Sequence, residues 1–383
     1  MQDRAAMFCR MLEKAFHSSA QRANKHRLRF PPLTSVDLPD IWIPRHDTSI
    51  AKTCSPHLKT NSAIGQTARV LEGKPIANNI NSWIAAEISE LKNTIGKTPG
   101  LGVILVGGRR DSQSFVHIKM KACMKVGIAP FTVELPEDCT EAELLDAVSS
   151  FNENPLIHGV VVQLPLPKHL DEEKIISYVS PEKDVDGFHP TNVGNLAMRG
   201  REPSFIPCAS KSCVELLLRN DVKIKGKNVV VVGRSKLGGL PTSLLIQRHH
   251  ATVTTVHAFT GNPEQVTCGA DILVSDIGVP NMIRGHWLKP GVIVVDMGAN
   301  SVEDTGSLQG HRLVVDVCYE EAIVKASAIT PVPGVVSGPT YAHLDYSNAY
   351  LLPLFSIGYG YNHNILRSKF ILFQLRKSTY LSG

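Results

Sequence analysis

A lysine in the stretch SFVHIKMKA (114–122) occupies a position where it could do chemistry. Lys119 follows Phe115 by four residues and Val116 by three, and on a helix these spacings put the three side chains on one face. A lysine beside apolar side chains is either a catalyst held in a dry pocket or a surface lysine. In the second case its stem lies along the apolar face and its ammonium group reaches water.

Two other segments place polar side chains where α/β proteins bind ligands. In VVVQLPLP (160–167), Gln163 follows an apolar strand, and ligands bind at the carboxyl ends of such strands. Gln163 could instead only bond loop backbone. In KDVDGFHPTNVG (183–194), Asp184 and Asp186 would face opposite sides of an extended chain, which argues against a shared metal ion. One of the two could then bond a ligand while the other caps a turn or forms an ion pair.

The cysteine and histidine spacings predict no metal site. The chain has no C-x-x-C pair and no H-E-x-x-H pattern, and Cys208 and Cys213 are five residues apart, unlike a zinc knuckle. We expect free, mostly buried thiols in a reducing compartment.

A glycine-rich turn in VVVVGRSKLGGLP (229–241) has the features of a dinucleotide site. Gly233 would end a buried strand and Gly239 would open a helix. Glycines there let the backbone approach a phosphate, and the helix N-terminus attracts the anion. Ser235 stands at the second glycine position of G-x-G-x-x-G, so the pattern is not strict. The strand–helix–strand context favours a nucleotide, and a turn that serves only packing is the alternative.

The next strand bears on the choice between NADP and NAD. It ends VHAF (256–259), without the carboxylate that bonds the ribose 2′-hydroxyl of NAD. Arg234 in the turn could pair with the 2′-phosphate of NADP, or be a solvated turn cation. The sequence therefore favours NADP and leaves NAD possible.

These residues need parallel sheets to position them, and the hydrophobic pattern predicts two. Order should begin near Val70. The first unit has helical patterns at 76–93, 112–127 and 140–152 and strand patterns at 101–107 and 158–167. The second has a helix at 210–221, a strand–turn–helix at 227–248, and strands at 251–258, 270–278 and 291–298. We therefore expect a two-domain α/β fold of doubly wound parallel sheets, the second domain Rossmann-like.

The two ends of the chain differ from the body. Residues 1–66 hold ten Lys and Arg against five Asp and Glu, and residues 67–383 hold 30 of each. The neutral body gives no reason to expect nucleic acid, and no apolar run reaches the ~18 residues of a membrane span. The basic, Ser- and Ala-rich start resembles an organellar transit peptide with a linker, or else a disordered tail with no address. Residues 341–383 contain six of the eight tyrosines and one acid, which indicates a segment of different origin.

Five motifs in this order, SFVHIKMKA, GVVVQLPLP, EKDVDGFHPTNVG, GRSKLGGLP and SAITPVPG, together resemble one family. It is the bifunctional methylenetetrahydrofolate dehydrogenase/methenyltetrahydrofolate cyclohydrolase, and the similarity, which spans residues 67–334, is greatest to plant organellar members. The resemblance implies oxidation of 5,10-methylenetetrahydrofolate by NADP⁺, then hydrolysis to 10-formyltetrahydrofolate, in one-carbon metabolism. It also implies a homodimer in the mitochondrion, with the plastid as the alternative.

The resemblance also implies a folate-binding catalytic domain at 67–207, an NADP-binding domain at 208–329 and a return segment at 330–383. Lys119 matches the general acid/base of the cyclohydrolase, Gln163 the glutamine that orients it, and Asp186 the carboxylate that bonds the pterin. Further residues match positions at the folate site (Ser112, Phe115, Val162, Leu164, Pro333 and Gly334) or at the cofactor site (Gly233, Arg234, Ser235, Gly239, Ala258 and Ala299).

Several residues depart from the family pattern. Phe115 stands where the family has tyrosine, and Ala258 where many members have a serine for the 2′-phosphate. Asp276 and Val315 replace small residues, and the resemblance places Asp276 beside the nicotinamide, where it would hinder cofactor binding. Ala299 replaces a bulky aliphatic, and the return segment is altered after Gly334.

These departures favour a second hypothesis: a degenerate or truncated paralogue that binds folate or an intact subunit without full catalysis. An unrelated amino-acid dehydrogenase with a similar cofactor domain is a third, but it leaves QLPLP and KDVDGF unexplained.

Overall fold

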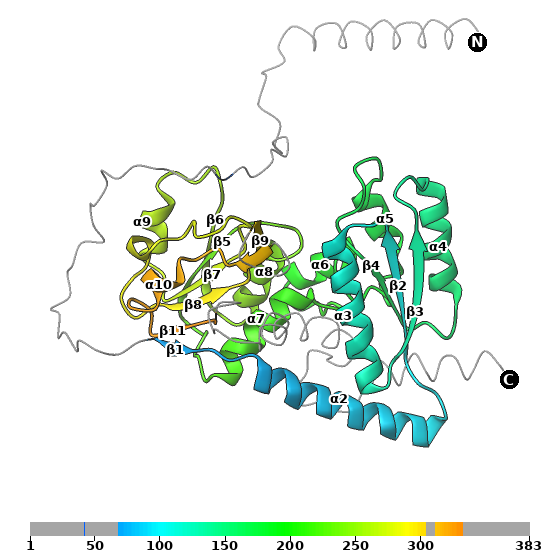
Figure 1. Ribbon diagram of the computed structural model, residues 1–383. Coiled ribbons are helices and arrows are strands. Elements are labelled where there is room, and N and C mark those ends of the chain that lie inside the picture. Colours follow the sequence, from blue (N-terminus) through cyan, green and yellow to red (C-terminus); the bar gives the residue numbers. More distant parts are fainter. Residues whose placement is uncertain (1–41, 43–67, 304–310, 332–383) are drawn as a thin grey trace, which may run out of the picture. The chain divides into compact units, whose positions relative to one another are not determined.

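A computed structural model describes residues 42, 68–303 and 311–331, and within them the chain forms two parallel β-sheets covered by helices (Figure 1). The predicted fold class is confirmed. The expected transit peptide and linker (apart from Trp42), Pro333, Gly334 and the altered return segment beyond residue 331 lie outside the described residues.

The first sheet has three strands in the order β3-β2-β4, all parallel. Its elements are α2 (Lys74–Ile95), β2 (Gly100–Val106), α3 (Arg110–Val126), β3 (Ala129–Leu135), α4 (Glu141–Glu153), β4 (Gly159–Val162) and α5 (Glu172–Tyr178). The central strand β2 is buried on both faces. Val103 and Leu105 pack with α2 and α3, while Ile104 and Val106 pack with α4 and α5. Figure 1 shows α3 and α4 on opposite sides of this sheet.

Two helix boundaries follow directly from the residues that form them. Thr140 caps α4: its hydroxyl accepts from Glu143 N–H, and the Glu143 carboxylate accepts from Thr140 N–H, which makes a capping box. Gly127 ends α3 in the left-handed region with φ of 91°. Strand β3 was not predicted, because it begins two residues after that glycine and its side chains are half-buried or exposed.

The second sheet has six strands in the order β1-β11-β8-β7-β5-β6, again parallel. The strands are β1 (Arg69–Val70), β5 (Asn228–Val232), β6 (Thr252–Val256), β7 (Ile272–Ser275), β8 (Ile293–Asp296) and β11 (Ala328–Ile329). The chain runs from β5 outward to β6 and returns on the other side of β5 as β7. The crevice between the carboxyl ends of β5 and β7 is therefore the topological switch point, where open α/β sheets bind ligands.

Helices cover both faces of this second sheet. The helices α7 (Cys208–Arg219) and α8 (Gly239–Arg248) pack on one face. The opposite face contacts residues around η1 (Gly285–Trp287) and α10 (Tyr319–Ala322), together with Val266 of α9 (Pro263–Thr267). The connections after β6 and β7 contain only short helices, because α9 has five residues and η1 has three.

Some elements had no counterpart in the predictions. Strand β1 pairs with β11, so the start of the described segment lies in the second sheet rather than the first. Helix α6 (Pro190–Ala197) follows the acidic loop, and β9 (Asn300–Glu303) forms an antiparallel pair with β10 (His311–Val314).

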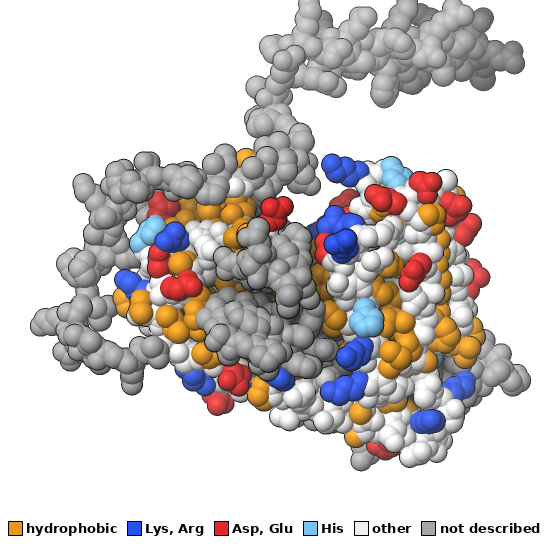
Figure 2. Space-filling model, viewed as in Figure 1, with side chains coloured by type: hydrophobic (Ala, Val, Ile, Leu, Met, Phe, Trp, Pro, Cys, Tyr) orange, Lys and Arg blue, Asp and Glu red, His pale blue; other side chains and the backbone are white. Residues whose placement is uncertain are grey.

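The described surface carries both signs of charge. Figure 2 shows Lys and Arg side chains interspersed with Asp and Glu side chains over the visible face. Within the described residues, no helix has the length and apolar character needed to cross a membrane.

Candidate active site

The structure pairs Lys119 with Asp186. Lys119 Nζ lies 3.9 Å from Asp186 Oδ1, and the two side chains are only 15% and 14% exposed. Lys119 comes from the third turn of α3, whereas Asp186 comes from the loop after α5. The ammonium group is thus largely withdrawn from water and placed against a carboxylate, unlike the fully solvated head of a surface lysine.

The loop that carries Asp186 is held by its neighbour Asp184. The buried Asp184 carboxylate accepts hydrogen bonds from the backbone N–H groups of Gly187, Phe188 and His189 and from Asn192 Nδ2. The chain therefore turns here. The expectation that Asp184 and Asp186 face opposite sides had assumed an extended chain, which the structure does not have. Asp184 serves the loop backbone, which leaves Asp186 to face Lys119.

Burial raises the pKa of Asp186, and the positive charge of Lys119 partly opposes this rise. Burial also raises the pKa of Asp184, while its hydrogen bonds from Asn192 and His189 oppose it. Asp186 is therefore a carboxyl group with more than ordinary proton affinity, close to a lysine amine. Such a pair can hold and exchange a proton.

Two buried oxygens at the same edge of the first sheet lack a hydrogen-bond partner among the described residues. They are Ser112 Oγ and Gln163 Oε1, in residues that are 3% and 9% exposed. Ser112 lies two turns before Lys119 on α3, and Gln163 follows β4, where its N–H donates to Ile104 O of β2. Gln163 Nε2 donates to Leu164 O at 2.7 Å. Buried polar atoms are rarely unpaired, so these two oxygens indicate a place for a polar ligand or water.

The other residues predicted for the folate side differ in exposure. Phe115, one turn before Lys119, is 41% exposed and available for stacking. Val162 is 6% exposed with its side chain in the core, so only its backbone could meet a ligand. Leu164 is half-buried and precedes the cis bond to Pro165.

The predicted dinucleotide turn lies at the switch point of the second sheet. Gly233 directly follows β5 with φ of 115°, and a Cβ there would lie 2.0 Å from Asp276 O. A Cβ on Gly239, the first residue of α8, would lie 2.5 Å from Gly233 O. Only glycine fits these two positions. Ser235 Oγ accepts from Gly238 N–H at 2.9 Å, which closes the turn.

Arg234 projects from this turn toward the end of β6. Its guanidinium carbon lies 5.8 Å from the centroid of the Phe259 ring. Ala258 immediately precedes Phe259 in the turn after β6. Ala299 is exposed in the loop between β8 and β9.

Three aspartates lie near this edge: Asp276 directly follows β7, Asp296 ends β8 and Asp316 comes after β10. Asp276 Oδ2 accepts from Ser235 Oγ and Gly239 N–H. Burial raises the pKa of Asp276, and those two hydrogen bonds oppose the rise. Burial and the neighbouring Asp316 raise the pKa of Asp296 to about 8.

Asp316 itself accepts from Ser275 Oγ and Ile277 N–H. Of these three aspartates, only Asp276 stood out in the sequence. The sequence did contain a signal for Asp296, because this residue is a carboxylate at the end of an apolar strand.

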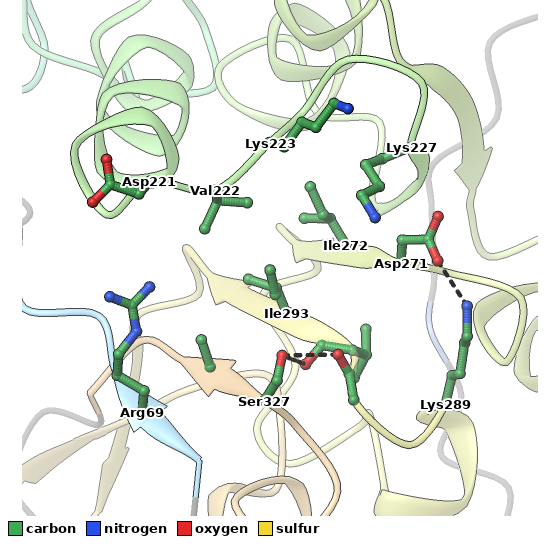
Figure 3. Close-up of a pocket in the computed structure, with 13 residues that line it drawn as sticks. Arg69, Asp221, Val222, Lys223, Lys227, Asp271, Ile272, Lys289, Ile293 and Ser327 are labelled. Carbon is green, nitrogen blue, oxygen red and sulfur yellow. Dashed lines mark hydrogen bonds and ion pairs between the residues drawn. The ribbon is translucent and has the colours of Figure 1, made fainter.

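A cavity of about 400 Å³ lies elsewhere, where the strands of the second sheet begin (Figure 3). Its lining includes Lys227 before β5, Ser327 before β11 and an ion pair between Lys289 and Asp271. Because ligands of open parallel sheets bind at the carboxyl ends, this cavity is not the candidate site. The described residues contain no cluster of three or more potential metal ligands from His, Cys, Asp and Glu.

The fold and these two sites define a class: a two-domain α/β enzyme with a nucleotide-binding turn in one domain and a lysine–carboxylate pair in the other. Two family models match the chain. They are "Tetrahydrofolate dehydrogenase/cyclohydrolase, catalytic domain" at residues 71–186 and "Tetrahydrofolate dehydrogenase/cyclohydrolase, NAD(P)-binding domain" at residues 207–350.

Curated relatives agree with the family models. The chain is 54% identical over 314 residues to "Bifunctional protein FolD 1, mitochondrial" of Arabidopsis thaliana, which covers 82% of this chain and 87% of that protein. It is 55% identical over 277 residues to "Bifunctional protein FolD 4, chloroplastic" of the same plant. That match covers 72% of this chain and 77% of the relative.

Among solved structures, the Trypanosoma brucei methylenetetrahydrofolate dehydrogenase-cyclohydrolase, complexed with NADP and an inhibitor, superposes with a TM-score of 0.72 at 36% identity. That match covers 82% of this chain and 99% of the other.

The chain belongs to the tetrahydrofolate dehydrogenase/cyclohydrolase family. It is a bifunctional NADP-dependent enzyme of folate one-carbon metabolism, which oxidises 5,10-methylenetetrahydrofolate and hydrolyses the methenyl product to 10-formyltetrahydrofolate.

Proposed function

We propose that Lys119 is the general acid and base of the hydrolytic step, with Asp186 and Gln163 as its partners at the folate. The observation that carries this proposal is the mostly buried Lys119–Asp186 pair. The unpaired oxygens of Ser112 and Gln163 at the same sheet edge support it, because a bound folate or water would satisfy them.

In this mechanism the amine of Lys119 takes a proton from the water that adds to the methenyl carbon. A C–O bond forms, and the bond from that carbon to N5 then breaks as the hydroxyl becomes the formyl C=O and releases its remaining proton to solvent. Lys119 returns the first proton to N5. Gln163 Oε1 accepts a hydrogen bond from the attacking water. Asp186, whose pKa is raised by burial, bonds the polar edge of the pterin.

The turn after β5 fits the cofactor. Gly233 and Gly239 let the turn fold tightly, because a Cβ on either would meet the backbone of Asp276 or of Gly233, and the N-terminus of α8 favours the negative charge of a diphosphate. Arg234 reaches the Phe259 ring, which follows Ala258 in the chain, and could pair with a 2′-phosphate there. We therefore infer a preference for NADP⁺ over NAD⁺ that rests more on Arg234 than on a hydroxyl. When bound, NADP⁺ supplies the hydride acceptor, and the protein's part is to hold the two rings face to face.

Phe115 is the departure with the clearest chemical consequence. Its exposed ring can stack on a ligand but cannot hydrogen-bond Lys119, as a tyrosine one turn away could. This loss, together with the altered segment after Gly334, supports the second candidate, a paralogue that binds folate or an intact subunit with reduced catalysis.

We further propose import into the mitochondrion, with the plastid as the alternative, and assembly as a homodimer. The basic, Ser- and Ala-rich first 66 residues support import. The relatives named above are mitochondrial in one case and chloroplastic in the other.

The experiment that tests the function is reduction of NADP⁺ by the purified protein given 5,10-methylenetetrahydrofolate, with NAD⁺ in parallel and hydrolysis of 5,10-methenyltetrahydrofolate followed separately. Turnover with a preference for NADP⁺ supports the assigned roles. A folded, soluble protein that binds folate without turnover supports the second candidate instead.

A further inference from the structure

Asp276 lies inside the dinucleotide turn rather than beside it. It directly follows β7, and its N–H donates to Val232 O at the end of β5, which places it in the switch-point crevice. Its carboxylate then reaches the start of α8. Oδ2 accepts from Ser235 Oγ at 2.5 Å and from Gly239 N–H at 2.6 Å.

The carboxylate also fills the space that the glycines leave open. A Cβ on Gly238 would lie 2.7 Å from Asp276 Oδ2, so the carboxylate rests directly over this glycine. The backbone of Asp276 lies closer still to Gly233, where a Cβ would be 2.0 Å from Asp276 O. The room over Gly238, the hydroxyl donor and the N–H at the helix start are all used by one side chain.

These are the features with which such a turn holds a dinucleotide diphosphate: glycine clearance, exposed N–H donors and the positive end of a helix. A carboxylate satisfies the same donors with the same sign of charge. It therefore stands in for the diphosphate and competes with it, both for hydrogen bonds and by repulsion.

We propose that Asp276 is a built-in competitor for the cofactor's diphosphate, which NADP⁺ must displace from Ser235 and Gly239 in order to bind. This inference rests on the proposed assignment of the turn to the cofactor. It predicts that the protein trades cofactor affinity for stability, because the same carboxylate caps α8 at its positive end.

The test is the Kd of NADP⁺ for the full chain, measured by titration calorimetry, in the wild type and in Asp276→Ala and Asp276→Asn. A second probe, adenosine 2′-phosphate, carries the 2′-phosphate but no diphosphate. The matched control is Asp221→Asn, which removes one negative charge at the opposite edge of the sheet, at a φ of 59° that asparagine tolerates.

We expect Asp276→Ala to bind NADP⁺ about tenfold more tightly or better, because a charge-assisted competitor has been removed. Asp276→Asn, which keeps the shape and loses the charge, should show a smaller gain. Affinity for adenosine 2′-phosphate should stay the same in all variants, and Asp221→Asn should match the wild type. The thermal midpoint of Asp276→Ala without ligand should fall.

Unchanged or weaker NADP⁺ binding in both Asp276 variants overturns the inference and makes Asp276 a structural residue of the turn. If the alanine variant does not fold, the asparagine variant decides. If wild type and variants bind neither NADP⁺ nor adenosine 2′-phosphate, the assignment of the turn to the cofactor fails as well, which separates the two failures.

Discussion

At the scale of single residues, Lys119 carries the clearest prediction. We expect Lys119→Met to lower the rate of methenyltetrahydrofolate hydrolysis by about 10²–10⁴-fold, the usual contribution of a general acid or base. Part of the dehydrogenase activity should remain, because hydride transfer needs positioning and no side-chain base. The measurement is the two initial rates on one protein preparation, with the exposed Lys121→Met as the matched control on the same helix.

Hydrolysis that persists in Lys119→Met at the wild-type rate would return this lysine to a structural or surface role. A parallel loss of both activities would instead point to lost folate binding.

Phe115 permits a gain-of-function prediction. The ring is 41% exposed, so a tyrosine hydroxyl can be added without a clash in the core. We expect Phe115→Tyr to raise the hydrolytic rate on the order of tenfold, the value of one hydrogen bond to a charged group. The double variant Phe115→Tyr with Lys119→Met should show no such gain. No change, or a fall, in the single variant would reject the role of the missing hydroxyl.

How much of the site the sequence could predict also depends on the residue. Lys119 could be placed on an apolar face because its neighbours are three and four residues away on the same helix. Its contact with Asp186 could not, since 67 residues separate the two and no periodicity encodes that distance. The hydrogen bonds of Asp276 to Ser235 and Gly239 were equally hidden, because they depend on the register of β7 against β5.

At the scale of elements, the sequence predicted those whose signals are local. Helix α4 was found because Thr140 and an acidic first turn mark its start, and α3 because Gly127 marks its end. Strand β3 has a mixed, half-exposed pattern and gives no such signal. The hairpin β9–β10 depends on pairing between segments that are only four residues long.

The contact between α10 and the segment before η1 gives an acid-stability prediction. The Glu321 carboxylate accepts from the Arg284 guanidinium and from Gly285 N–H, and these bonds, led by the one to Arg284, lower its pKa to about 2. The folded pKa lies below the unfolded one, so the stabilisation is present above about pH 4.5 and is lost as the pH falls toward about 2.

Glu321→Gln should therefore lower the free energy of unfolding by about 0.5–1 kcal/mol at pH 7, a value kept small by the exposure of both partners. The difference from the wild type should shrink at pH 2.5. Urea unfolding at the two pH values measures this, and Glu320→Gln on the same helix is the control. An equal difference at both pH values would rule out an ionic origin.

At the scale of the whole molecule, the described residues form separate hydrophobic clusters around the two sheets. Two clusters contain β2 and β4 with α2, α3 and α4, and two contain β5, β7 and β8 with α7, α8 and η1. Ile76 is a point of connection, since it packs against one cluster of each sheet. With little shared core, a ligand of one sheet should stabilise mainly that sheet.

Two tryptophans can report which of the two sheets a ligand stabilises. Trp287 in η1 packs in the core of the second sheet, and Trp83 in α2 packs against the core of the first sheet. We expect NADP⁺ at 100 times its Kd to stabilise the sheet around Trp287 by about 2.7 kcal/mol. The urea midpoint of a chain with Trp287 as its single tryptophan should rise, and that of a chain with Trp83 alone should move less. Equal shifts in the two chains would mean that both sheets unfold as one cooperative unit.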